Sequence, residues 1–352
     1  MAAVACAAMA VRVGIGLFTA QLPSGSTRTF TQEYRDTIEL VRLAEDAGFD
    51  AAWVSEHHGS SDGYLPSLFV LLGALAAATE RIDLGTGVIL TPLHDPIRLA
   101  EDAAVVDQLS GGRLTVGLGL GWREEEFHML RIPFEQRLAR HVETVGILRK
   151  AWTGRRFSFE GDVFRYDRVR VTPPPAQPGG PRILLGGYVA SALRRAGEIG
   201  DGHITDADDP AALGGAVAAV DAGARAAGKD PASLRYVLMQ NAFVVDDGDG
   251  WPIVRDGVLH QWGSYEAWAE DHDTPAHDSL EPAVGDEDAA RRATPAGTPS
   301  EVAERLAAIV DPWRERDVEL IVRLHYPGMD LAPAARAVEL FGTHVLPALR
   351  GR

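Results

Sequence analysis

The sequence predicts a (β/α)8 barrel (a TIM barrel) with an insertion after its seventh strand, and three observations lead to this prediction. Eight short β-rich runs alternate with helical stretches, a pattern typical of a parallel sheet covered by helices. The 352 residues suit one such barrel. Hydrophobic residues make up 46% and charged residues 24%, which allows a large core. An open doubly wound sheet is the alternative, but eight units favour a closed barrel.

The first half of the chain contains four of these units. We expect their strands at residues 11–18, 50–55, 82–90 and 113–119. The helix after the first strand begins with the capping-box spacing of Thr29 and Gln32, and it ends at Gly48. The next helices are expected near residues 66–79, 96–109 and 137–152. A long loop, residues 122–135, precedes the last of them, and no helix is expected directly behind Gly121.

The second half contains the other four units. Their strands are expected at residues 182–186, 202–205, 235–245 and 319–324, with helices from 190, at 210–228, from 299 and at 332–349. Thr298, Pro299 and Glu301 form a capping box with proline in the first helical position. Residues 157–171 alternate aromatic and polar side chains, which predicts a hairpin outside the barrel.

Two segments depart from the repeating pattern. Residues 1–10 are small and apolar without a basic start, so we expect a frayed extension before a single domain at 11–352. Residues 246–297 are rich in Asp, Gly, Pro and Glu and contain three tryptophans. This segment is too long for an ordinary loop, so we expect a partly helical insertion or lid.

Composition excludes several classes of function. A formal net charge of −16 argues against binding to nucleic acid, which needs clustered Lys and Arg. The sequence contains no run of 18 or more apolar residues, so it predicts no membrane span. The single cysteine, Cys6, rules out a disulfide or a cysteine-based metal site within one chain, which suits a cytoplasmic protein.

The strongest candidate site is Glu56-His57-His58, directly after the second strand. Catalytic groups of such barrels collect at the carboxyl ends of the strands, so we expect these residues to be catalytic. A solvated turn is the alternative. Adjacent strand residues point to opposite faces, so the two histidines do not easily share one metal ion, and we expect no metal. His94 and His203 are the histidines that would supply further ligands from other strands.

Two glycine-rich turns are the other candidates. Gly119 lies in Gly117-Leu118-Gly119-Leu120-Gly121 after the fourth strand, where missing side chains would admit a flat ligand; tight packing is the alternative. Gly186, Gly187, Tyr188 and Ser191 lie between the fifth strand and its helix. Amide groups at a helix N-terminus bind phosphate well, although a plain turn would look similar. Gly87 lies within the third strand, which suggests a bulge or a close backbone approach.

The chain resembles the luciferase-like monooxygenases, the bacterial-luciferase-like flavin-dependent oxidoreductases. The matching segments lie at residues 44–58, 79–122, 184–202, 297–306 and 339–349. The first reads AEDAGFDAAWVSEHH, and the second contains TGVILTPLHDPIRLAEDAAVVDQLSGGRLTVGLGLGW. The resemblance leaves out the first ten residues and the insertion. It implies a TIM barrel that binds reduced FMN or a deazaflavin at its strand ends.

The resemblance also implies roles for individual residues. His57 matches the catalytic histidine near the flavin C4a, and Gly87-Val88 matches a position where a non-proline cis peptide is frequent. Gly119 stands where bacterial luciferase has a reactive cysteine, and Leu120 stands where it has a phosphate-binding arginine. Arg137 matches a second phosphate arginine, with Gly187, Tyr188 and Ser191 completing that site.

From the resemblance we expect a monooxygenase that uses reduced FMN and O2 to oxygenate a small aldehyde, ketone or similar substrate through a C4a-peroxyflavin. A separate flavin reductase and a homodimer built on helices around strands two to four are expected as partners. A deazaflavin (F420)-dependent dehydrogenase is the first alternative, and a non-catalytic flavin-binding protein is the second. A metal-dependent hydrolase is the least favoured.

Overall fold

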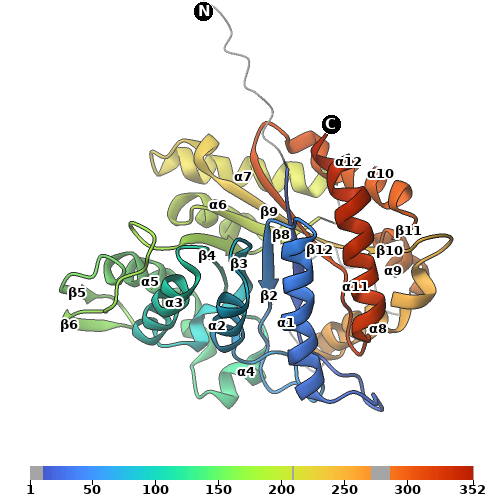
Figure 1. Cartoon of the computed structure of the whole chain (residues 1–352). Coiled ribbons are helices and arrows are strands. Elements are labelled where there is room, and N and C mark those ends of the chain that lie inside the picture. The colour runs from blue at the N-terminus through green and yellow to red at the C-terminus, as the bar shows by residue number, and fades with distance from the viewer. Residues whose placement is uncertain (1–10, 208–209, 271–285, 352) are drawn as a thin grey trace, which may run out of the picture.

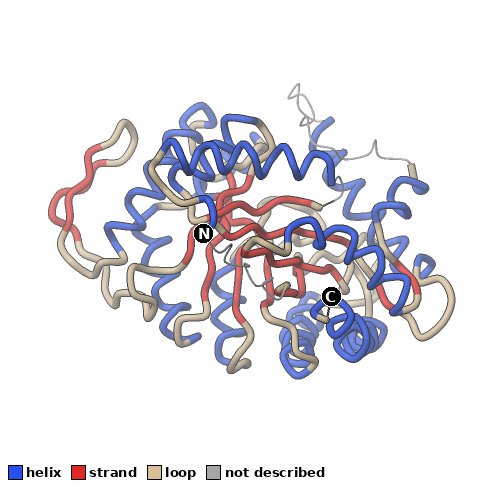
Figure 2. The backbone as a smooth tube through the Cα atoms, turned by 90° about the horizontal axis from the view of Figure 1, so that it is seen from above, coloured by secondary structure: helices blue, strands red, loops and turns tan. Residues whose placement is uncertain are grey.

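The computed structural model describes residues 11–207, 210–270 and 286–351. Eight parallel strands close into a barrel in the order β1-β12-β9-β8-β7-β4-β3-β2, and helices surround it (Figure 2). The predicted (β/α)8 fold is therefore confirmed. The expectation for residues 1–10 lies outside the described residues.

All eight predicted barrel strands are present, with ends that differ by a few residues. They are β1 (Arg12–Phe18), β2 (Ala51–Val54), β3 (Asp83–Leu90), β4 (Leu114–Gly119), β7 (Arg182–Gly186), β8 (Gly202–Asp206), β9 (Arg235–Asn241) and β12 (Asp317–Arg323). The helices that cover them are α1 (Phe30–Asp46), α2 (Leu68–Ala78), α3 (Pro96–Ser110), α5 (Arg137–Ala151), α6 (Ala190–Ile199), α7 (Pro210–Ala226), α10 (Pro299–Val310), α11 (Leu331–Leu340) and α12 (Leu346–Arg350). Both predicted capping boxes, at Thr29 and at Thr298, are formed.

Two local predictions need correction. The predicted strand 235–245 is divided at Ala242, because β10 (Phe243–Val244) leaves the barrel and pairs with β11 (Ala296–Gly297). The predicted loop 122–135 contains a helix, α4 (Glu124–Met129), so the expectation of no helix behind Gly121 was wrong. Six residues are too few for a helical period to show in the sequence. The hairpin β5 (Phe157–Glu160) and β6 (Arg165–Val169) projects from one side, as predicted (Figure 1).

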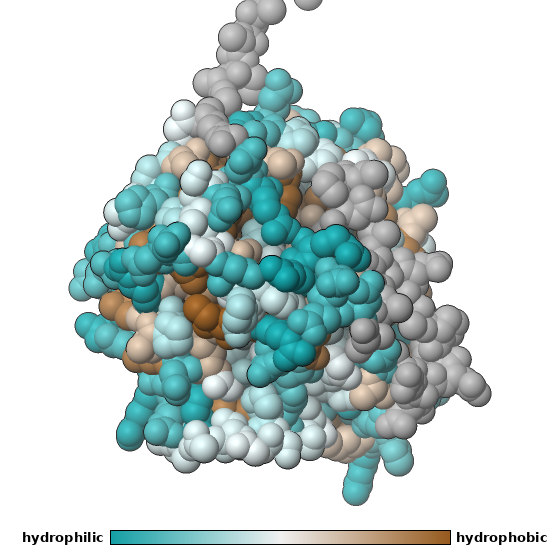
Figure 3. Space-filling view, turned by 90° about the vertical axis from the view of Figure 1, so that its right-hand side faces the viewer, coloured by the Kyte–Doolittle hydropathy of each residue, from teal (hydrophilic) through white to brown (hydrophobic). Residues whose placement is uncertain are grey.

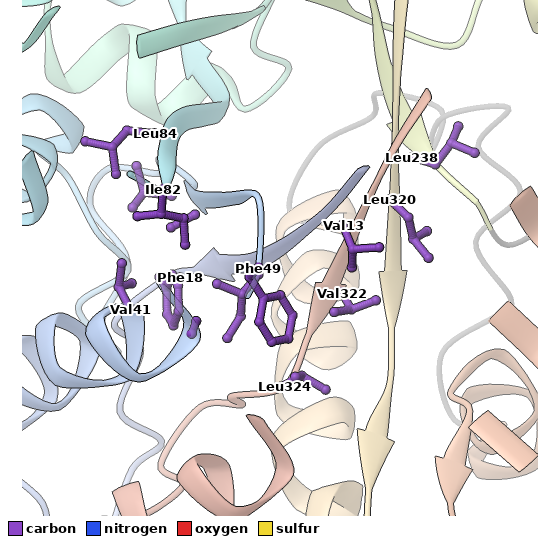
Figure 4. Packing of buried hydrophobic residues seen from close by; sticks show 14 of the residues in the cluster. Val13, Phe18, Val41, Phe49, Ile82, Leu84, Leu238, Leu320, Val322 and Leu324 are labelled. Carbon is purple, nitrogen blue, oxygen red and sulfur yellow. The ribbon is translucent and has the colours of Figure 1, made fainter. Parts of the chain in front are cut away.

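The hydrophobic core has two main parts, beside a small cluster of Leu90, Leu93 and Phe127. One fills the space between the strands and the helices, where side chains such as Val13, Phe49 and Leu320 pack (Figure 4). The other lies inside the barrel and includes Trp53, whose indole N–H donates to buried Glu319 at 2.6 Å. Three apolar side chains packed against this inner cluster, Leu17, Val88 and Met239, are only partly buried.

The insertion is partly helical, as predicted. It contains α8 (Trp251–Glu270) and α9 (Glu287–Ala293), while residues 271–285 lie outside the described ones. In Figure 1, α8 and α4 both lie near the lower end of the molecule. The molecular face on the insertion side is mostly hydrophilic, with small separate apolar patches (Figure 3). Among the described residues, no helix is long and apolar enough to cross a membrane.

Candidate active site

The centre of the candidate site is an imidazole–carboxylate pair at the carboxyl end of β2. His57 Nδ1 lies 2.9 Å from Oε1 of Glu126, which is on α4. Both side chains are buried, and the same Glu126 oxygen also accepts the backbone N–H of His58 at 2.8 Å. No described group hydrogen-bonds to His57 Nε2. The carboxylate therefore orients the ring and leaves Nε2 available as an acid or base.

Arg123 supports this pair from the residue before α4. Its Nη1 donates to the carbonyl oxygen of His58 at 3.1 Å and lies 3.4 Å from Glu126 Oε1. Its guanidinium carbon lies 4.0 Å from the ring centre of Trp268 on α8, a cation–π contact. Arg123 thus compensates the charge of a buried carboxylate and joins it to the insertion.

Glu56 and His58 face away from His57, in agreement with the expectation that adjacent residues diverge. Glu56 is buried, accepts the backbone N–H of Leu90 at 2.6 Å and lies 2.9 Å from His94 Nε2. Burial alone would raise the pKa of Glu56, but His94 and His58 outweigh it and lower that pKa to about 2. Glu56 is therefore a fixed anion that ties β2 to the end of β3.

The ligating atoms of Glu56, His58 and His94 lie within 4.8 Å of one another, close enough to hold a metal ion. This group differs from the adjacent pair His57 and His58 considered in the sequence. The hydrogen bonds from Leu90 and His94 already supply partners for the Glu56 carboxylate. His203, the other histidine considered as a ligand, instead faces the carbonyl oxygen of Leu185, 2.7 Å from its Nδ1.

Aromatic side chains enclose the His57 ring. Tyr64, Tyr265 and Trp268 have ring centres 4.8, 5.5 and 4.9 Å from it. The Tyr64 hydroxyl lies 3.0 Å from Ser55 Oγ and 3.2 Å from the Tyr265 hydroxyl. Since Tyr265 and Trp268 belong to α8, the insertion forms part of the wall around the candidate catalytic histidine.

The glycines expected near the cofactor pack around Val88. The Gly87–Val88 peptide bond is cis, as the resemblance implies. A Cβ atom on Gly119 would lie 2.5 Å from Val88 Cγ2, and one on Gly186 would lie 3.5 Å from Val88 Cγ1. Close packing with Val88 therefore explains Gly119, while half-buried Val88 itself borders the barrel mouth.

The start of α6 offers a place for phosphate. Val189 makes no side-chain cap, and residues Tyr188 to Ser191 are exposed. Gly187 has φ of +141°, a conformation that a side chain would strain. The Tyr188 hydroxyl donates to Asp206 at the end of β8. The uncapped amide groups at Ala190 and Ser191 are suited to an anion.

The structure does not bring Arg137 into contact with these α6 residues. Its guanidinium donates to the Phe134 carbonyl oxygen at 3.3 Å and stacks 3.8 Å above the Phe134 ring. Leu120, in the position of the missing arginine, is half-buried. One helical turn beyond Arg137, His141 is buried, and burial together with nearby Arg195 lowers its pKa to about 4. Arg195 is thus a basic residue of α6 that the sequence did not single out.

Sequence reasoning missed several residues of this site. Glu126 is the third of three consecutive glutamates, and only the direction of α4 distinguishes it from its neighbours. The contacts of α8 join residues about 200 positions apart, so no local pattern indicates them. The feature of the sequence that could have indicated these contacts was the number of aromatic residues in the insertion.

Comparison with known proteins identifies the family of the chain. Residues 11–315 match the family model described as luciferase-like monooxygenase. A curated relative is the F420-dependent glucose-6-phosphate dehydrogenase of Intrasporangium calvum, 29% identical over 90% of this chain and 95% of its own. The structure of monooxygenase RslO1 from Streptomyces bottropensis covers 96% of this chain and 99% of its own, with TM-score 0.78 and 26% identity.

A third structure is similar in fold alone. It is the oxygenating constituent of 3,6-diketocamphane monooxygenase from Pseudomonas putida in complex with FMN, with TM-score 0.75 and 20% identity over 96% of this chain and 99% of its own. The barrel, the site at its carboxyl end and the family match together define the class. The chain belongs to the luciferase-like monooxygenase family and is an oxidoreductase of that family, which includes both FMN- and F420-dependent enzymes.

Proposed function

We propose that this protein is a deazaflavin (F420)-dependent dehydrogenase that oxidises the alcohol group of a small organic substrate. The observation that carries the proposal is the 2.9 Å contact between His57 Nδ1 and buried Glu126. Oxidation of an alcohol needs a base for the hydroxyl proton, and an imidazole fixed by a carboxylate is well suited to that task. This reverses the preference for FMN drawn from the sequence.

Residues of this chain take up the proton that the alcohol loses. As the substrate C–H bond breaks, its electron pair leaves with the hydrogen, the O–H proton passes to His57 Nε2, and a carbonyl group forms. Glu126 stabilises the resulting imidazolium through Nδ1. A bound deazaflavin supplies the carbon that accepts the hydride. In the reverse direction the same imidazolium returns the proton.

The residues at the mouth fit such a cofactor. The half-buried side chains of Leu17, Val88 and Met239 offer an apolar surface for a planar ring. The exposed, uncapped start of α6 suits a phosphate group. The similarity to an F420-dependent dehydrogenase over 90% of the chain supports the same choice.

An FMN-dependent monooxygenase is the second candidate, because His57 is enclosed by three aromatic rings. A reaction with oxygen benefits from a site that excludes water, and such an enclosure supplies this. The similarity to monooxygenase RslO1 supports this candidate.

The test is to titrate the purified protein without oxygen with F420 and with FMN, each oxidised and reduced, and then to add a panel of small alcohols. We expect F420 to bind and its visible absorbance to fall when an accepted alcohol is added. His57→Gln should bind F420 but reduce it much more slowly. Binding of FMN alone, with a product that forms only when oxygen is then admitted, would establish the second candidate. Binding without turnover, unchanged in His57→Gln, would indicate a non-catalytic flavin-binding protein.

A further inference from the structure

Arg323, the last residue of β12, is a buried cation that has no hydrogen-bonded or ion-paired partner for its guanidinium among the described residues. Only 5% of its surface is exposed, and its Nη1 atom is fully covered. Across the described residues, its guanidinium donates no hydrogen bond and has no carboxylate within 4.0 Å. An uncompensated charge in such a place costs several kcal/mol, so it needs an explanation.

The strand places Arg323 at the barrel mouth. Glu319 contacts Trp53 inside the barrel and Ile321 belongs to the inner apolar cluster. Side chains alternate along a strand, so Arg323 points to the same interior, one layer nearer the carboxyl end. Burial raises the pKa of the Tyr64 phenol, and the nearby charge of Arg323 opposes part of that rise. Tyr64 in turn lies edge-on to His57.

Nearby Asp206 does not neutralise Arg323. Burial raises the pKa of Asp206, while Tyr188 and Arg323 oppose that rise. The two side chains lie beyond ion-pair distance, and the Asp206 carboxylate accepts the Tyr188 hydroxyl instead.

Two other arginines whose side chains are mostly covered are paired. Arg28 contacts the carboxylates of Glu33, Asp36 and Asp330 at 2.7 to 3.1 Å. Arg123 contacts Glu126 and a backbone carbonyl. Both connect elements of the fold through their partners. Arg323 connects nothing through its guanidinium, so a structural role of that kind does not account for its charge.

We infer that Arg323 binds an anionic oxygen group of a ligand at the barrel mouth. A planar guanidinium pairs with carboxylate or phosphate through two parallel hydrogen bonds, and burial strengthens such a contact. The ligand is either a substrate with a carboxylate or phosphate near its alcohol carbon, or the reduced cofactor through the anionic edge of its ring. The inference about the cofactor rests on the proposed function, whereas the anion site itself does not.

The experiment compares thermal unfolding of the wild type, Arg323→Met and Arg323→Lys, with Arg28→Met as a matched control. Without ligand, Arg323→Met should melt no lower than the wild type, and about 2 °C higher if one kcal/mol of charge burial is relieved. Arg28→Met should melt lower, because it leaves three carboxylates without their partner. Each protein is then measured with inorganic phosphate, glycolate or reduced F420 against sodium chloride of equal ionic strength.

At least one of these probes should stabilise the wild type, lose that effect in Arg323→Met and keep part of it in Arg323→Lys. Loss for phosphate or glycolate assigns Arg323 to the substrate, and loss for reduced F420 alone assigns it to the cofactor. The inference is overturned if Arg323→Met melts as low as Arg28→Met, or if no probe distinguishes the wild type from Arg323→Met. Failure of F420 to bind the wild type would contradict the proposed function, while the phosphate and glycolate measurements would still decide the anion site.

Discussion

Glu126 differs from Glu124 and Glu125 only in the direction that α4 gives its side chain. Glu124 and Glu125 are exposed, whereas Glu126 is 1% exposed and meets His57. The helix begins with three acidic residues, which suit the positive end of its dipole. One helical turn thus contains two glutamates that face the solvent and a third that contacts the candidate catalytic histidine.

This difference gives the first prediction. Glu126→Gln should lower kcat for alcohol oxidation roughly 10²- to 10⁴-fold, because the neutral amide no longer stabilises the imidazolium of His57. Glu124→Gln on the same turn should leave kcat unchanged. Steady-state kinetics of the two variants, after circular dichroism has shown that both are folded, provide the measurement. Equal rates for both variants would remove Glu126 from the mechanism.

The sequence could indicate His57 because a short motif after a strand is a local signal. It could not indicate Glu126, because burial within a run of three glutamates depends on packing with β2, 69 residues away. Arg323 was missed for a related reason. It lies one residue before the end of the predicted strand 319–324, but only the structure shows that no carboxylate of the described residues pairs with it.

At the scale of elements, α6 and α7 approach each other through glycines. A Cβ on Gly197 would lie 1.9 Å from the carbonyl oxygen of Val220, and one on Gly223 would lie 2.0 Å from that of Arg194. Each helix thus places a glycine directly against the backbone of the other. A side chain larger than hydrogen forces the helices apart at either place.

The second prediction follows from this contact. Gly223→Ala should lower the free energy of unfolding by about 1–3 kcal/mol, because the added methyl group meets backbone that cannot move aside. Gly215→Ala lies on the same helix, where an added Cβ meets nothing within 4 Å. It should raise the free energy by about 1 kcal/mol through its better helix propensity. Urea denaturation of both variants is the measurement, and changes of the same sign would contradict the packing argument.

One carboxylate contributes to the attachment of α8 beside the aromatic contacts described above. Asp62, in the loop after β2, lies 2.8 Å from His260 Nε2 and also accepts hydrogen bonds from Ser60 and Gln21. Burial would raise the pKa of Asp62, but these hydrogen bonds, with His260 first, lower it to about 2. The bonded form is therefore the charged one.

The third prediction concerns the stability of the protein at acidic pH. The pKa of Asp62 is lower in the folded protein than its ordinary value of 3.8, so its stabilising effect is complete above about pH 4 and is lost as the pH falls toward 2. Asp62→Asn should make the free energy of unfolding less dependent on pH in this window. Hydrogen exchange of residues 251–268 should also speed up in this variant at neutral pH. An unchanged pH dependence would show that Asp62 does not hold α8.

At the scale of the whole molecule, the barrel was predictable because each βα unit carries its own signals. Thr29 and Thr298 cap helices through residues three positions away, and these boxes were readable in the sequence. Ala242, where the chain leaves the barrel, carries no such signal, because β10 is formed only by pairing with β11, more than 50 residues later. The path of the insertion depends in the same way on distant contacts.

The fourth prediction concerns assembly. Val70, Val105 and Leu109 are 75%, 46% and 56% exposed on the adjacent helices α2 and α3. We propose that the surface of α2 and α3 forms the homodimer that the family resemblance implies, since exposed apolar side chains favour association. Val70→Asp should convert a dimer into a monomer in light scattering coupled to size exclusion. Ile253→Asp, the same kind of exchange at an exposed apolar position of α8, should leave the mass unchanged. A wild-type monomer would end the proposal.

Two of the three aromatic rings that enclose His57 come from outside the (β/α)8 repeat. The histidine and its carboxylate belong to the loops after β2 and β4, whereas Tyr265 and Trp268 come from an insertion some 200 residues later. The candidate catalytic pair and two of the rings that enclose it therefore lie in separate segments of the chain. An exchange of residues 246–297 with those of a relative should transplant the choice of substrate while the recipient keeps its own cofactor, so new specificities can arise by recombination without disturbing the catalytic pair.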